Sequence, residues 1–385
     1  MFKLSLSLLS VAALLPLVAS HTAFFHPSMY GFNVTIDTDP SLPFDNRPVA
    51  PLRDRNFSQW WFHGHLDFPP NPTDIFELPV GKPAIAELAC RKNATSYFAS
   101  AEGTTDTRDP LNPNDVCPGF NSTAYHALNQ EDAAGCALAI TYKSNVTDVQ
   151  PEDFTVFSVN QTCVWTRFTE FQVPKRMPVC PPGGCTCAFF WTHSNGGGPN
   201  AENYMNGFKC NVTGSSPQAP ALATPKVPRR CGADPENFKL QNVPGNCTYG
   251  AKQPFYWKNL ERNNMFEAKE TPPVYNDLYN FLDGAQDDIF EDSYNGTLPD
   301  PSPVAPVPVL AEVPELPPVA QRQSSTPGSG SGTAGSTCHL KRSFSSGSLA
   351  TRSLNAYSTG NWVPAMSRRS RKLHTGRAKS LWHIL

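Results

Sequence analysis

Two hydrophobic patterns divide this chain. An uninterrupted apolar run extends from Leu4 to Leu17, whereas residues 21–297 carry short β-branched and aromatic runs separated by Pro, Gly and Asn clusters, without a helical period. The second pattern predicts an all-β fold, an immunoglobulin-like β-sandwich with long loops. We expect its strands over residues 136–142, 154–159, 163–168, 187–193 and 203–206, with a turn at 181–184.

The N-terminal apolar run has the layout of a secretory signal peptide over residues 1–20. Lys3 precedes the run, and the small residues Val18, Ala19 and Ser20 follow it. Cleavage after Ser20 would make His21 the first residue of an exported, extracellular chain. No second run of 18 apolar residues follows, so we expect no membrane span in the processed protein.

Cysteines and glycosylation sequons also indicate secretion. Ten of the 11 cysteines lie between Cys90 and Cys247, which is typical of a disulfide framework in an oxidising compartment, although spacing leaves the connectivity open. Nine Asn-x-Ser/Thr sequons predict surface glycosylation, at Asn33, Asn56, Asn93, Asn121, Asn145, Asn160, Asn211, Asn246 and Asn295. They stop at Asn295, which supports a domain boundary near residue 297.

The C-terminal part has a different composition. Residues 298–336 are rich in Pro and then in Ser and Gly, which predicts a linker. Residues 337–385 form a basic tail, expected to be disordered, that contains Cys338 but no Asp or Glu. Its basic run 368–372 could bind anionic wall or membrane surfaces, or the tail could be trimmed after residue 342 or 369. It lacks the hydrophobic end of a lipid-anchor signal.

A histidine at the start of the mature chain has particular metal chemistry. The freed α-amine has a pKa of only about 8, and together with the imidazole Nδ1 of His21 it can close a chelate ring. One further histidine nitrogen would complete an all-nitrogen, T-shaped set, which favours Cu(II) among divalent ions. The alternative is coincidence, because signal peptidase must cut somewhere.

The motif His63-Gly-His65 is a second candidate metal pair. Residues i and i+2 of a strand point to the same face, so the two rings could bind one ion. The neighbouring aromatic cluster Trp60-Trp-Phe62 and the prolines Pro69 and Pro70 favour a loop or packing role at least as strongly.

Two further segments carry a resemblance to a known family. Both segments resemble parts of lytic polysaccharide monooxygenases. In the first, His126 is followed by a Cys-containing strand at 135–142. In the second, Trp191-Thr-His193 is followed by Glu202-Asn-Tyr204. Within this group the chain is most similar to auxiliary activity family 14, the fungal lytic xylan oxidases. The similarity rests on residues 22–26, on the aromatic and histidine cluster 60–65 and on the tail. The resemblance covers about residues 21–290.

The resemblance implies a site and an activity. His21, His126 and Tyr204 would bind one copper ion, with Tyr204 in the axial position. The implied reaction is oxidative cleavage of glycosidic bonds in xylan on cellulose, with an external electron donor and O2 or H2O2 as oxidant. The implied protein is a monomer that presents its copper on an open face to the polysaccharide surface.

Glu202 is a candidate for positioning oxygen species or moving a proton. Two residues apart on a strand, Glu202 and Tyr204 should face the same side, although a solvated strand-end acid is the alternative. Many relatives have glutamine there. His193 shares parity with Trp191, and we expect it to be structural.

Two other functional classes stay open on sequence alone. One is a secreted copper-binding protein that takes up copper without oxidising polysaccharide, and the other is a wall glycoprotein whose histidines are incidental. No Ser-His-Asp, paired-carboxylate or P-loop arrangement has better support, and nothing indicates nucleic-acid binding or a cellulose-binding module.

Overall fold

The described part of the chain contains nine strands, arranged in two sheets. The computed structural model describes residues 21–34, 48–101, 103, 105–120, 130, 133–193, 202–268 and 270–294. The smaller sheet has the order β1-β3-β6, and the larger has the order β2-β8-β7-β4-β5-β9. The strands are β1 (Ala23–Phe25), β2 (Phe76–Pro79), β3 (Pro83–Ala89), β4 (Cys136–Thr141), β5 (Thr155–Asn160), β6 (Phe168–Gln172), β7 (Cys185–Thr192), β8 (Asn203–Thr213) and β9 (Gly284–Ala285).

Helical structure is short in the described residues. The α-helix α1 (Phe57–Trp60) is capped by Asn56, whose side chain accepts a hydrogen bond from the Gln59 N–H in a capping box. The 3-10 helix Trp61–Gly64 follows directly. Further 3-10 turns lie at Lys92–Ala94, Phe98–Ser100, Val146–Asp148, Pro151–Asp153, Pro235–Asn237, Pro244–Asn246 and Asp277–Tyr279. None of these helices is long or apolar enough to cross a membrane.

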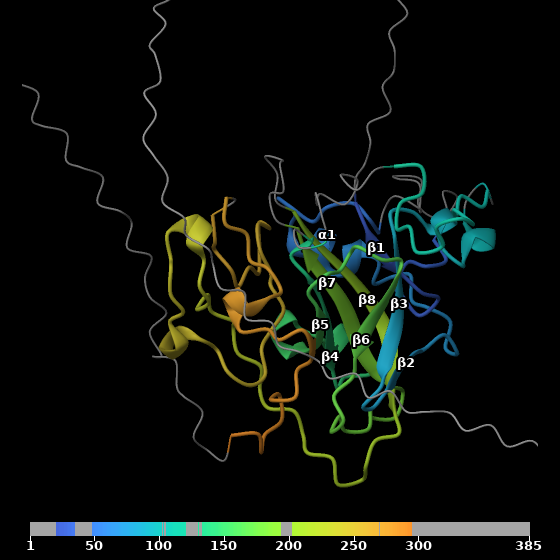
Figure 1. The fold of residues 1–385 in the computed structure, drawn as a ribbon. Coiled ribbons are helices and arrows are strands. Elements are labelled where there is room, and N and C mark those ends of the chain that lie inside the picture. The colour runs from blue at the N-terminus through green and yellow to red at the C-terminus, as the bar shows by residue number, and fades with distance from the viewer. Residues whose placement is uncertain are drawn as a thin grey trace, which may run out of the picture. The chain divides into compact units, whose positions relative to one another are not determined.

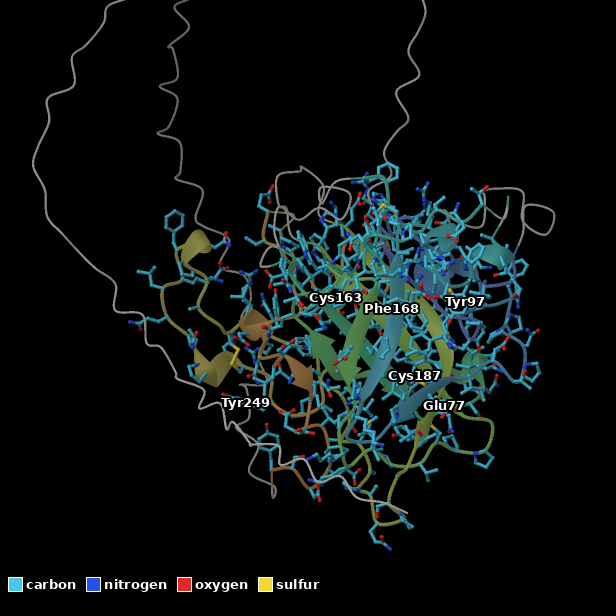
Figure 2. The ribbon with its side chains drawn as sticks, turned by 45° about the vertical axis from the view of Figure 1, so that its right-hand side comes forward. Glu77, Tyr97, Cys163, Phe168, Cys187 and Tyr249 are labelled. Atoms are coloured by element: carbon cyan, nitrogen blue, oxygen red, sulfur yellow. A yellow bond between two sulfur atoms is a disulfide. The ribbon has the colours of Figure 1, made fainter. Side chains whose placement is uncertain are left out.

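The two sheets enclose a hydrophobic core. In Figure 1 strands β3 and β6 lie in front of β7 and β8. Phe24 of β1 stacks on Phe208 of β8, with ring centroids 4.4 Å apart, and also contacts Phe76 of β2. Figure 2 shows side chains crowding this space, Cys187 of β7 among them. The predicted β-sandwich is therefore confirmed.

Strand β4, in the middle of the larger sheet, is covered by side chains on both of its faces. All six of its residues are buried. Cys136, Leu138 and Ile140 face the core between the sheets, whereas Ala137 and Ala139 belong to a second apolar cluster. That cluster includes Trp60, Trp61 and Phe62 after α1 and aromatic residues of the 255–281 segment. Because both faces are covered, this strand is apolar from Cys136 to Ile140 instead of alternating with polar residues.

The predicted disulfide framework is also confirmed. The ten cysteines of the domain form five bonds, Cys90–Cys117, Cys136–Cys163, Cys180–Cys185, Cys187–Cys210 and Cys231–Cys247. One of them, Cys187–Cys210, joins the paired strands β7 and β8. These strands carry the candidate site at their other end.

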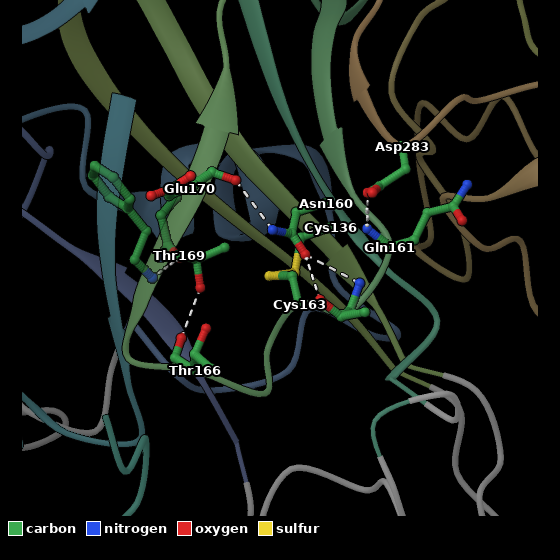
Figure 3. The surroundings of a disulfide bond; sticks show 11 residues. Cys136, Asn160, Gln161, Cys163, Thr166, Thr169, Glu170 and Asp283 are labelled. Carbon is green, nitrogen blue, oxygen red and sulfur yellow. Dashed lines mark hydrogen bonds between the residues drawn. A yellow bond between two sulfur atoms is a disulfide. The ribbon is translucent and has the colours of Figure 1, made fainter. Parts of the chain in front are cut away.

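One predicted strand is wrong. Residues 161–166 form turns and bends, and β6 begins only at Phe168. The Asn160 side chain accepts from the Thr162 N–H at 3.1 Å, and the Asn160 carbonyl accepts from the Cys163 N–H, so the chain reverses before it reaches the disulfide to Cys136 (Figure 3). The local Asn turn outweighs the apolar residues that favour a strand.

The other strand predictions hold, with shifted ends. Strands β4, β5 and β7 lie within about a residue or two of the expected ranges, β8 continues well beyond residue 206 to Thr213, and the turn at 181–184 is closed by the Gly184 N–H donating to Pro181 O. His126, the residues 1–20, Asn121, Asn295, Cys338, the linker and the tail lie outside the described residues.

Candidate metal centre

The pairing of β7 with β8 brings three of the candidate side chains to one end of the sheet. Trp191 is opposite Tyr204, and the His193 N–H donates to the Glu202 carbonyl at 3.2 Å. His193, Glu202 and Tyr204 therefore meet where β7 ends and β8 begins. All three are buried.

His21 reaches the same end of the sheet through β1. Ala23 pairs with Ala89 of β3, and the Phe24 N–H donates to the Asn206 side chain of β8 at 3.2 Å. This arrangement places the His21 ring 5.8 Å from the Tyr204 ring, edge to face. Residues that are 183 positions apart in sequence thus become neighbours.

Glu202 is at the centre of the cluster. Its Oε2 accepts a hydrogen bond from the Tyr204 hydroxyl at 3.0 Å and lies 3.6 Å from Nε2 of both His21 and His193. Its Oε1 lies 3.2 Å from a guanidinium nitrogen of Arg53. Glu202 and Tyr204 face the same side, as their spacing predicts, and their side chains are hydrogen-bonded. Glu202 is a buried acid with four polar neighbours instead of a solvated strand-end residue.

The electrostatics fix the charge state of both residues. Burial raises the pKa of the Glu202 carboxyl, but His193, the charge of His21 and the Tyr204 hydroxyl together outweigh burial and bring the pKa down to about 2. Burial and the neighbouring Glu202 charge raise the pKa of Tyr204 well above its ordinary value of 10. At neutral pH the pair is therefore a carboxylate that accepts from a neutral phenol.

Trp191 fixes the position of the phenol. Its indole stacks on the Tyr204 ring with centroids 4.6 Å apart and planes 22° apart, and both residues are almost fully buried. The stack leaves Tyr204 little freedom to rotate, since protein interiors are close-packed.

The donor set fits the copper ion that the resemblance implies. The Glu202 carboxylate lies beside Nε2 of His21, whereas a chelate with the freed amine uses the other ring nitrogen, Nδ1. A carboxylate on the second nitrogen is the usual partner of a metal-binding histidine. The described residues alone contain no group of three or more His, Cys, Asp or Glu arranged for a metal, and His126 lies outside them.

The alternative pair, His63 and His65, is packed in the protein interior. His63 Nδ1 lies 2.6 Å from the Met205 carbonyl and Nε2 lies 2.8 Å from the Ala50 carbonyl. Both residues are buried, and His63 has a left-handed backbone with φ of 56° instead of a strand conformation. These contacts support the packing interpretation of the motif.

Two residues of the cluster were not expected there. His193 was expected to be structural, which its position 3.6 Å from the Glu202 carboxylate does not contradict, but its place in this cluster was not predicted; its parity with Trp191 was the available signal. Arg53 was not a candidate at all. Its segment carries no motif, and only the fold brings it to Glu202.

Comparisons with known proteins identify the family of the chain. The family described as lytic polysaccharide monooxygenase AA14 matches residues 3–380. The chain is 59% identical to AA14 family lytic polysaccharide monooxygenase B of Pycnoporus cinnabarinus, over 80% of each chain. It is 50% identical to AA14 family lytic polysaccharide monooxygenase A of Trametes coccinea, over 77% of this chain and 67% of that one. The chain therefore belongs to the AA14 family of lytic polysaccharide monooxygenases.

Proposed function

We propose that this protein is a secreted copper-dependent monooxygenase that cleaves glycosidic bonds in xylan associated with cellulose. The observation that carries the proposal is the meeting of His21 with Tyr204 and Glu202 at the start of β8. Xylan, O2 or H2O2 as oxidant, and an external electron donor follow from the family resemblance. Five disulfides and the N-terminal apolar run support an extracellular location.

His21, His126 and Tyr204 would hold the copper. When bound, the ion supplies one-electron redox chemistry and activates the oxidant, which no side chain of the chain can do alone. The protein supplies the orientation of the ligands. Tyr204 would offer a neutral hydroxyl oxygen to the ion, because its pKa is raised well above 10. Glu202 holds that hydroxyl in place by accepting its hydrogen bond.

Product analysis tests this function. Copper-loaded protein, an electron donor and xylan-coated cellulose should together release oxidised xylo-oligosaccharides that mass spectrometry identifies, and the chelator-treated protein should release none. His126→Ala should lose both tight Cu(II) binding and the products. Tight copper binding by the wild type without any oxidised sugar would favour copper uptake instead, and an unchanged copper EPR spectrum in H126A would exclude His126 as a ligand.

A further inference from the structure

Only two side chains of the cluster can meet a substrate from outside. The side chains of Glu202 and His193 are 5% and 4% exposed, and Tyr204 is 1% exposed. The His21 side chain is 18% exposed and that of Arg53 is 34% exposed. A polysaccharide lying over this end of the sheet therefore contacts His21 and Arg53 before any other member of the cluster.

The Arg53 guanidinium has donors to spare. One terminal nitrogen, Nη1, lies 3.2 Å from Glu202 Oε1, and within the described ranges the structure records no other hydrogen bond or ion pair of this side chain. A guanidinium carries five N–H donors in a planar fork. The remaining donors match the hydroxyl and ring oxygens of a sugar, which accept hydrogen bonds.

The backbone around Arg53 is held firmly on both sides. The Leu52 N–H donates to the Asn203 carbonyl at 2.9 Å, and the Asn203 amide donates back to the Leu52 carbonyl at 3.1 Å. The Asp54 N–H donates to the Lys258 carbonyl at 2.8 Å. Because Asn203 lies between Glu202 and Tyr204, this frame fixes Arg53 relative to the site, and binding through it requires little new ordering of the backbone.

We propose that Arg53 links the bound polysaccharide to the site. Its guanidinium donates one hydrogen bond to a sugar oxygen and another to Glu202 at the same time. One group therefore sets both the position of the polysaccharide over the site and the position of the Glu202 carboxylate. This inference rests on the proposed function and identifies a substrate-contacting residue for it.

Binding of copper-free protein to xylan-coated cellulose provides a test that does not depend on turnover. Arg53→Gln should bind about tenfold more weakly than the wild type, because a hydrogen bond from a charged donor is lost. Arg53→Lys, which keeps the charge but not the fork, should fall between the two. The matched control is Arg55→Gln, two residues along the same segment, where no side-chain hydrogen bond or ion pair is recorded among the described residues; its binding should not change.

The copper-loaded proteins provide a second readout. Addition of substrate should change the Cu(II) EPR spectrum of the wild type and of R55Q, and the change should be absent in R53Q even at saturating substrate. Equal substrate binding by R53Q and the wild type would overturn the link and leave Arg53 as a purely structural partner of Glu202, provided that thermal unfolding shows both proteins folded. A wild type that releases no oxidised sugar would instead refute the proposed function itself.

Discussion

Glu202 connects residues that come from four separate parts of the chain. One carboxylate oxygen, Oε1, lies beside Arg53. The other, Oε2, lies beside His21, His193 and Tyr204. A buried carboxylate is stable only when charges or donors replace water, and here they hold its pKa at about 2. Glutamine has a similar shape but no charge, so the exchange isolates the electrostatic contribution.

We therefore expect Glu202→Gln to lower the free energy of unfolding by about 1–3 kcal/mol at pH 7, since the Arg53 guanidinium loses its counter-charge. Urea denaturation of the metal-free protein measures this loss. The control is Glu152→Gln, because Glu152 forms an ion pair with Arg262 in which both side chains are more than a third exposed, and its loss should cost under about 1 kcal/mol. Equal losses in the two variants would contradict a buried, charged role for Glu202.

The sequence predicted part of this cluster. The spacing of Glu202 and Tyr204 was sufficient to predict that they face the same side, and the structure adds the hydrogen bond between them. The place of Arg53 could not be predicted, since it depends on the path of an irregular segment held by Asn203. The place of His193 beside Glu202 was not predicted for a related reason: its register against Glu202 depends on which strand pairs with β7.

At the scale of elements, β1 positions His21 although it has only three residues. His26 directly follows β1, and its Nδ1 accepts from the Ser28 N–H at 3.1 Å while its ring contacts Phe24 and Phe76. Burial lowers the pKa of His26 from 6.5 to about 4, against an opposing influence of Asp74. The neutral ring is therefore part of the folded structure at this end of the strand.

This shift predicts a pH dependence of stability. Between pH 6.5 and 4 the unfolded state binds more protons at His26 than the folded state does, so the stabilisation is complete above about pH 6.5 and is lost as the pH falls towards 4. His26→Asn keeps an acceptor for Ser28 but does not titrate. The difference in unfolding free energy between wild type and H26N should shrink by about 3 kcal/mol from pH 7 to pH 4 in denaturant titrations. A difference that stays constant with pH would show that His26 does not carry this dependence.

Strands differ in how well the pattern predicts them. β4, β5 and β7 are rich in apolar and β-branched residues and almost entirely buried, so they were predictable from residue type. β1 is too short to show a period, and β3 begins at a proline and contains Glu87, whose burial depends on an ion pair with the distant Arg167. Such strands form because partners exist in the fold, which a local pattern does not contain.

At the scale of the whole molecule, the charges are unevenly distributed. Residues 21–294 contain 20 Lys and Arg against 30 Asp and Glu, while the sequence beyond residue 321 contains ten Lys and Arg and no acid. The near-neutral total thus combines an acidic domain with a basic C-terminal part. That contrast is a property of the sequence that needs no structure to predict.

The account depends most on the removal of residues 1–20, because only a chain that begins at His21 has the amine for the chelate. The decisive measurement is a Cu(II) titration, followed by EPR and calorimetry, of two proteins that begin at His21 and at Ser20. We predict tight, stoichiometric binding with an all-nitrogen equatorial spectrum for the His21 form, and binding at least about a hundredfold weaker for the form that retains Ser20. Equal affinity and identical spectra in the two forms would contradict the central claim that the N-terminal His21 holds the copper.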